Sequence, residues 1–221
     1  MITHDKKAPL VKWLAVPVLV LMSCTNMLQV DHGETDLNDP IKFGLLQPMS
    51  LERTRQEALY LVTVLAAEEI NNAGGVLGRD IEIVFRDDGG SGSQGVREAR
   101  QLYNEGVEFI IGPGWSSVTL AVAQEVTIPN NMLLMSPSAT NSRITTLADN
   151  NLVWRTANSD IFQARIGADY AYQTLGKRTA GIIYRSNVWA EGLAESFRTN
   201  FEQLAGAGSV VFFNEALIHG T

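Results

Sequence analysis

From Ile41 onward, the sequence alternates between short apolar runs and longer segments rich in helix-forming residues. The apolar runs have the length and composition of strands, and the segments between them are long enough for crossover helices. The expected strands are 41–46, 80–88, 109–111, 132–135, 153–155, 179–184 and 209–213, and the expected helices are 53–72, 94–105, 117–126, 160–175 and 189–204. This alternation predicts an α/β fold with parallel strands and helices on both faces of the sheet.

Two of the expected helices carry recognisable end signals. The helix over 53–72 ends at "NNAGG", where Gly74 and Gly75 supply the positive φ that a C-terminal cap needs. Asp160 with Gln163 predicts a capping box at the start of a later helix. The helix over 53–72 also has a broad apolar face, made of Leu59, Val62, Ala66 and Ile70.

The N-terminus has the pattern of an export signal. Three lysines precede "WLAVPVLVLMS", an apolar run of signal-peptide length that is short for a bilayer span. The run ends in "LMSC", which resembles the lipobox of bacterial lipoproteins, with Cys24 as the lipidated residue. We therefore expect a signal peptide over 1–24, a flexible tether over 25–40, and an exported, lipid-anchored protein in the cell envelope, in the periplasm or on the outer face of the cytoplasmic membrane. An ordinary signal peptide that contains a cysteine is the alternative.

Charge and residue types argue against several functions. The formal net charge is −7, and no basic stripe interleaved with aromatic residues points to nucleic acid. Cys24 is the only cysteine, which excludes an internal disulfide. None of His4, His32 and His219 forms a triad pattern with Ser116, and the sequence has neither a metal-ligand spacing nor a GxxxxGK[ST] phosphate loop. We expect no enzyme activity, no metal and no cofactor.

Polar residues follow two of the expected strands. "FIIGPGWSSVTLA" leads from a strand through a Gly-Pro-Gly turn to Ser116 and Ser117, and "MLLMSPSATNS" leads to Ser138, Ala139 and Thr140. Ligands of parallel α/β sheets bind beyond the carboxyl ends of the strands, so these residues are candidates for one site. Alternatively, Ser116 only caps its own helix, and "SPSAT" is only a polar loop.

Together, these segments resemble the branched-chain amino-acid binding family, the type I periplasmic binding proteins that supply ABC importers. The resemblance rests on "AAEEINNAGGVLGRDIEIVFRDD", "EGVEFIIGPGWSS", "SPSATNSRIT", "VWRTANSD", "GKRTAGIIY" and "WAEGLAESF". It extends over 41–221. It implies a two-lobed protein, with an N-terminal lobe over 41–155 and an incomplete second lobe over 156–221.

The resemblance also assigns roles to individual residues. By analogy with the family, Ser116 binds the α-carboxylate of an amino-acid-like ligand or a related amide or carboxylate. In the loop 138–140, a backbone carbonyl and the Thr140 hydroxyl hold the ammonium group, and backbone N–H groups hold the carboxylate. Trp189 falls where many members place an aromatic residue over the ligand, although it could instead pack on its own lobe. Trp115 either lines the cleft or fills a core.

Two departures from the family concern specificity and length. Where most members have a glycine-containing turn after the first strand, this chain has "QPMSLERTRQEAL", so Arg53 and Arg55 either begin a solvated helix or reach an acidic ligand. Relatives continue beyond the position of Thr221, so we expect a truncated chain that binds amino acids weakly or not at all. An ABC permease is the expected partner, and the alternative is the ligand-sensing domain of a receptor or regulator.

Overall fold

The computed structural model describes residues 39–51 and 53–216, including the backbone but not the side chain of Ala216. The expected signal peptide, Cys24 and most of the expected tether lie outside the described residues, as do all three histidines. Signal-peptide cleavage and lipidation therefore stay predictions. None of the helices in the described ranges is long and apolar enough to cross a membrane.

The N-terminal part of the described chain is built on a five-stranded sheet of order β2-β1-β3-β4-β5. All four strand pairs are parallel, as the alternation of strands and helices predicts. The strands are β1 (Ile41–Gln47), β2 (Ile81–Asp87), β3 (Phe109–Ile111), β4 (Leu133–Ser136) and β5 (Val153–Arg155). Because the strands are parallel, the loops that follow them gather at one edge of the sheet.

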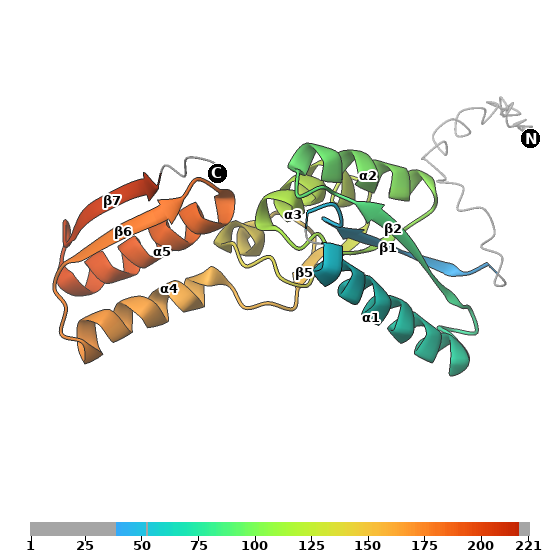
Figure 1. The fold of residues 1–221 in the computed structure, drawn as a ribbon, viewed down its shortest axis with the longest axis horizontal. Helices are drawn as coiled ribbons and strands as arrows, with labels where there is room; N and C mark the ends of the chain where they lie inside the picture. Colours follow the sequence, from blue (N-terminus) through green and yellow to red (C-terminus); the bar gives the residue numbers. More distant parts are fainter. Residues whose placement is uncertain (1–38, 52, 217–221) are drawn as a thin grey trace, which may run out of the picture. The chain divides into compact units, whose positions relative to one another are not determined.

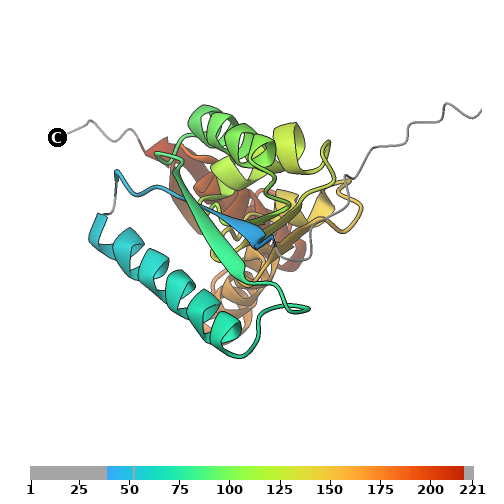
Figure 2. The same cartoon turned by 90° about the vertical axis from the view of Figure 1, so that its right-hand side faces the viewer.

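Helices cover both faces of this sheet (Figures 1 and 2). Helix α1 (Arg53–Asn72) lies on one face, and α2 (Gly92–Asn104) and α3 (Ser116–Val122) lie on the other. A π-helical turn, Ala123–Thr127, extends α3. The main apolar core lies on the α2 and α3 side, where Leu102, Val118 and Val122 pack against Leu46, Ile110 and Leu134 of the strands.

The apolar face of α1 is largely exposed. The sequence correctly predicts the helix and its glycine end, since Gly74 and Gly75 both have positive φ. However, only Gln56 and Ala67 of the helix are buried. Its contact with the sheet includes the edge-to-face pair of Tyr60 with Phe85, whose ring centroids lie 5.8 Å apart. Leu59, Val62 and Ile70 are exposed, because α1 packs mainly along β2 and no other described element covers this face.

A second, two-stranded parallel sheet follows. It pairs β6 (Ala180–Arg185) with β7 (Val210–Ala216). Helices α4 (Asp160–Asp169) and α5 (Val188–Ala205) pack against each other, and α5 packs on β6 and β7. A π-helical turn, Tyr170–Thr174, extends α4 to the predicted end of this helix.

The predicted capping box at Asp160 is wrong. The N-cap of α4 is Ser159, whose hydroxyl accepts a hydrogen bond from the Ile161 N–H. Asp160 is the first helical residue, and its side chain turns toward the loop after β4. The Asp160 carboxylate therefore accepts a hydrogen bond from this loop instead of capping its own helix.

The carboxyl group of Asp88, directly after β2, is buried in the turn that leads to α2. Its Oδ1 accepts a 2.7 Å hydrogen bond from the Gly90 N–H, whereas its Oδ2 has no hydrogen-bond partner among the described residues. Burial raises the pKa of Asp88 to about 6, against the opposing effect of the Gly90 hydrogen bond and with a smaller contribution from the charge of Asp87.

Substituting one buried and one exposed leucine tests where the core lies. Leu102 is 0% exposed within the core, whereas Leu61 on α1 is 62% exposed. Leu102→Ala should lower the free energy of unfolding by about 2–5 kcal/mol because it leaves a cavity. Leu61→Ala should change it by less than about 0.5 kcal/mol. Urea denaturation measures both, and a similar loss for the two variants would contradict the described packing of α1.

Asp88 should make stability depend on pH. Because its pKa is higher in the folded state than its ordinary value of 3.8, the native chain binds this proton more tightly than the unfolded chain does. The resulting stabilisation is complete below the unfolded pKa and is lost as the pH rises through about 6. Asp88→Asn removes this loss and keeps an oxygen for Gly90. The variant should therefore gain stability relative to the parent chain between about pH 4 and pH 7. A pH-independent difference in urea denaturation would sink this prediction.

Candidate functional site

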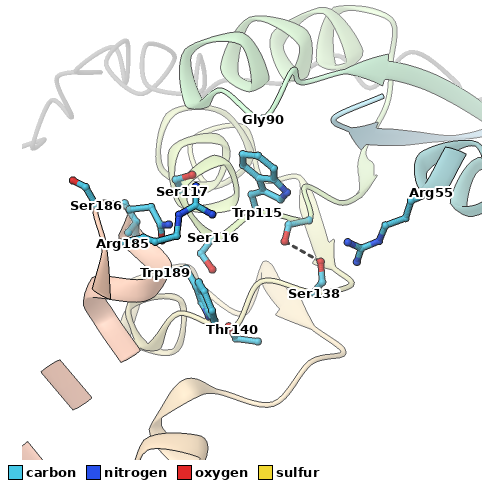
Figure 3. A pocket seen from close by; sticks show the side chains of 13 residues that line it. Arg55, Gly90, Trp115, Ser116, Ser117, Ser138, Thr140, Arg185, Ser186 and Trp189 are labelled. Atoms are coloured by element: carbon cyan, nitrogen blue, oxygen red, sulfur yellow. Dashed lines mark hydrogen bonds between the residues drawn. The ribbon is translucent and has the colours of Figure 1, made fainter. Parts of the chain in front are cut away.

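A cavity of about 560 Å³ opens where loops from both sheets meet (Figure 3). Its walls come from the start of α1, the loops after β2, β3 and β4, and the segment from the end of β6 to the start of α5. Five of the six residues that the sequence analysis nominates line it: Ser116, Ser117, Ser138, Thr140 and Trp189. The sixth, Ala139, belongs to the same loop as Ser138 and Thr140, but its side chain is buried and does not line the cavity.

The turn after β3 delivers Trp115 and Ser116 to the cavity. Gly112 begins this turn with a φ of 102°, and a Cβ at this position would lie 2.1 Å from the Leu46 carbonyl oxygen. Glycine is therefore required both by the backbone conformation and by the close approach of β1. The fold alone thus explains the glycine at the start of this turn.

The loop after β4 is fastened to the same turn by hydroxyl groups. Ser136 donates a 2.6 Å hydrogen bond to the Pro113 carbonyl and accepts one of 3.2 Å from the Ala139 N–H. Ser138 donates a 2.9 Å hydrogen bond to the Gly114 carbonyl, the dashed line in Figure 3. These bonds explain the change from apolar to hydroxylated residues at the end of β4, since one loop must satisfy the backbone of the other.

Ser116 does not cap its helix. The N-cap of α3 is Trp115, which makes no side-chain cap, and Ser116 is the first helical residue. The Ser116 Oγ accepts a 3.3 Å hydrogen bond from the Asn141 N–H. A hydroxyl group has one hydrogen to donate in addition to its acceptor sites, so this contact leaves the Ser116 hydrogen for an acceptor in the cavity.

Thr140 has the opposite arrangement. Its hydroxyl donates a 3.0 Å hydrogen bond to Oδ2 of Asp160, and its carbonyl accepts a 2.9 Å bond from the Asp160 N–H. Because the hydroxyl hydrogen is used by Asp160, the Thr140 oxygen can act only as an acceptor toward the cavity, through its lone pairs. Side chain and main chain of Asp160 thus fix the orientation of Thr140.

The Asp160 carboxylate adds negative charge behind Thr140. Its pKa is raised by burial, while the Thr140 hydroxyl, the Trp189 indole and the charge of Arg155 act in the opposite direction. Its second oxygen, Oδ1, is buried and has no hydrogen-bond partner among the described residues. This role of Asp160 is not evident from the sequence, where its position predicts a helix cap instead.

Asn141 is a second residue that the sequence analysis missed. Its side-chain Nδ2 donates a 2.7 Å hydrogen bond to the Val188 carbonyl at the start of α5. A Cβ at Gly192 would lie 2.4 Å from that nitrogen, so α5 needs glycine there for Asn141 to reach Val188. The only signal in the sequence is the position of Asn141 directly after Thr140, because its partners are distant along the chain.

Two tryptophans contribute aromatic surface. Trp115 and Trp189 are 42% and 44% exposed, and Figure 3 shows both indoles at the cavity. Trp115 lies over the turn after β2, where a Cβ at Gly90 would come within 2.8 Å of its ring. Trp189 also lines a second hollow, whose other walls come from α4, β6 and α5. The alternative that Trp115 fills a core is wrong, because its side chain is exposed. The place of Trp189 over a ligand stays a prediction.

The two arginines before α1 differ in their surroundings. Arg53 pairs with Glu57 of the same helix at 2.8 Å and is solvated. Arg55 lines the cavity. A further arginine, Arg185 at the end of β6, lies in the wall and was not anticipated from the sequence. No group of three or more metal-ligating side chains occurs in the part of the chain that the structure describes.

The model of the periplasmic binding protein family matches residues 40–213. A Leu/Ile/Val-binding protein homolog of Brucella melitensis is 33% identical over 60% of this chain and 36% of its own length. The leucine-, isoleucine-, valine-, threonine- and alanine-binding protein of Pseudomonas aeruginosa is 31% identical over 67% of this chain and 39% of its own length.

Solved structures of ABC transporter substrate-binding proteins have a similar fold. An ABC transporter substrate-binding protein of Desulfitobacterium hafniense in complex with Leu has a TM-score of 0.62 and 27% identity, covering 83% of this chain and 52% of that one. LivJ of Streptococcus pneumoniae in complex with isoleucine has a TM-score of 0.62 and 25% identity, covering 80% and 48%. The chain thus spans about half the length of these structures. The expected α/β fold is confirmed, and the chain belongs to the periplasmic binding protein family.

Proposed function

We propose that the protein is an extracytoplasmic solute-binding protein that captures a small amino-acid-like ligand in the cavity and delivers it to an ABC importer. The ligand lies between an N-terminal lobe over 41–155 and a second lobe that begins at residue 156, and its capture involves no covalent chemistry. The observation that carries this proposal is the opposite hydrogen-bonding polarity of Ser116 and Thr140, two hydroxyls in the wall of the same cavity.

This polarity suits a zwitterion. Ser116 has a hydrogen to donate to a carboxylate, and Thr140 has a lone pair to accept a hydrogen bond from an ammonium group. The buried carboxylate of Asp160 behind Thr140 favours positive charge on that side. Hydrogen bonds to charged groups contribute about 1.5–3 kcal/mol each, so three or four, less ordering costs, suffice for micromolar binding at about 8 kcal/mol.

The remaining nominated residues have subsidiary roles in the proposal. Ser117 and Ser138 add hydroxyl groups to the wall. Ala139 has a structural role in the loop after β4, because its side chain is buried and its N–H donates a hydrogen bond to the Ser136 hydroxyl. Trp189 covers the ligand from the start of α5. The names of the relatives support an amino acid as ligand. The Pseudomonas aeruginosa protein is named for leucine, isoleucine, valine, threonine and alanine, and the Streptococcus pneumoniae structure is in complex with isoleucine.

A thermal-shift screen of the purified protein tests the proposal. The panel contains aliphatic and acidic amino acids, their amides, and carboxylates that lack the amine. A ligand that binds only the folded state, at ten times its dissociation constant, raises the free energy of unfolding by about 1.4 kcal/mol. At least one amino acid should raise the melting temperature, whereas its counterpart without the amine should not, because the donor Ser116 and the acceptor Thr140 both lie in the described chain. The weak or absent binding expected from the length of the chain would instead give no shift. The proposal fails if no compound of any class shifts the transition.

Thr140→Val tests the acceptor role. Valine has nearly the same shape but lacks the oxygen, so affinity for the stabilising amino acid should fall about ten- to a hundredfold. The variant also removes the donor to Asp160, which should cost about 1–3 kcal/mol of folding stability. Calorimetry measures affinity and urea denaturation measures stability.

Thr156→Val is the matched control. The Thr156 hydroxyl is exposed, donates to the Pro137 carbonyl and does not line the cavity. This substitution should leave ligand affinity within about twofold of the parent chain, because it removes no group from the wall. Equal losses of affinity in both variants would contradict a specific role for Thr140.

A further inference from the structure

The cavity wall carries positive charge and no carboxylate among the described residues. Its only ionisable side chains are Arg55 and Arg185, and most of the other groups are hydroxyl, amide or glycine. Figure 3 shows the two guanidinium groups directed toward the cavity, Arg55 from α1 and Arg185 from the end of β6. The wall thus presents two arginines to the space in which a ligand would lie.

This lining suits a negatively charged ligand group better than an aliphatic one. The apolar side chains in the wall are Trp115, Val188 and Trp189. An aliphatic side chain gains from burial against apolar surface, whereas here it would displace water from charged and hydroxylated groups. A carboxylate instead matches the planar fork of a guanidinium and forms charge-assisted hydrogen bonds with it.

Arg185 can bind a ligand carboxylate without losing an ion pair with another described residue. No carboxylate of the described residues forms an ion pair with it, in contrast with Arg86, which pairs with Glu98 and Glu105. Arg185 is followed directly by Ser186 and Asn187, which line the same cavity and lead into α5. The N-terminus of this helix adds a partial positive charge of the same sign.

We propose that the preferred ligand is an acidic amino acid, whose side-chain carboxylate binds the guanidinium of Arg185 while Arg55 adds positive charge from α1. The α-carboxylate and the ammonium group keep their places at Ser116 and Thr140, so the inference rests on the proposed function. Asp160 lies behind Thr140, on the ammonium side, where its negative charge opposes placement of the acidic side chain there. The charges of the site thus select one orientation of the ligand.

Calorimetry of the purified protein with L-glutamate, L-glutamine and L-leucine tests the preference. Glutamate and glutamine have nearly the same shape and differ in side-chain charge, so glutamate should bind on the order of tenfold more tightly. Arg185→Gln should reduce this preference to about twofold or less, and Arg185→Lys should retain part of it, because lysine keeps the charge but loses the fork. Binding of L-aspartate, which has a shorter side chain, should fall in Arg185→Gln as well.

Arg165→Gln is the matched control, since Arg165 is exposed on α4 outside the cavity and its loss changes the net charge equally. It should leave the preference for glutamate unchanged. If leucine or glutamine binds as tightly as glutamate to the parent chain, the acidic-ligand inference is overturned while the proposed function stands. If no amino acid binds to the parent chain, both are overturned. Equal effects of Arg165→Gln and Arg185→Gln would also overturn the role of Arg185.

Discussion

The hydrogen bonds of Asn141 are the constraint on which the site depends. Its N–H reaches Ser116, its side-chain nitrogen reaches the Val188 carbonyl, and its side-chain oxygen accepts from the Arg143 N–H. Its carbonyl accepts a hydrogen bond from Arg155 at the end of β5. A fully buried amide with these polar groups paired tolerates little displacement, because an unsatisfied buried group costs about 1–3 kcal/mol. One residue therefore holds the loop after β4 against the starts of α3 and α5.

The electrostatics of the site follow from this arrangement. Once the loop is held, Thr140 meets Asp160, and Ser116 meets the Asn141 N–H. Each hydroxyl has one hydrogen, so its buried partner decides whether the cavity sees a donor or an acceptor. Negative charge then lies behind Thr140, and the positive charge of Arg55 and Arg185 lies in the wall itself. Together, these charges match a ligand that carries both signs.

Much of the architecture was predictable because it depends on local patterns. The bounds of α1 and β3 agree with the periodicity, and the glycines at 74, 75 and 112 have the positive φ that turns require. The structure differs from the prediction where a local pattern competes with a partner that is distant along the chain, or where that partner is lacking among the described residues. Asp160 has a capping sequence but bonds Thr140, twenty residues away, and the apolar face of α1 lacks a described partner despite its clear periodicity. Neither outcome is encoded within a window of one helix turn.

The sequence by itself determined the α/β class, the alternation of strands and helices that makes the sheet parallel, and the placement of hydroxyl-rich loops at strand ends. It could do so because hydrophobic periodicity and turn residues act over short distances. Only the tertiary structure decided which hydroxyl donates and which accepts, that Asn141 joins the loops, and that Arg185 shares a cavity with Arg55. These features join residues that are 20 to more than 100 positions apart. Their contacts exist only after the parallel strands have aligned their carboxyl ends.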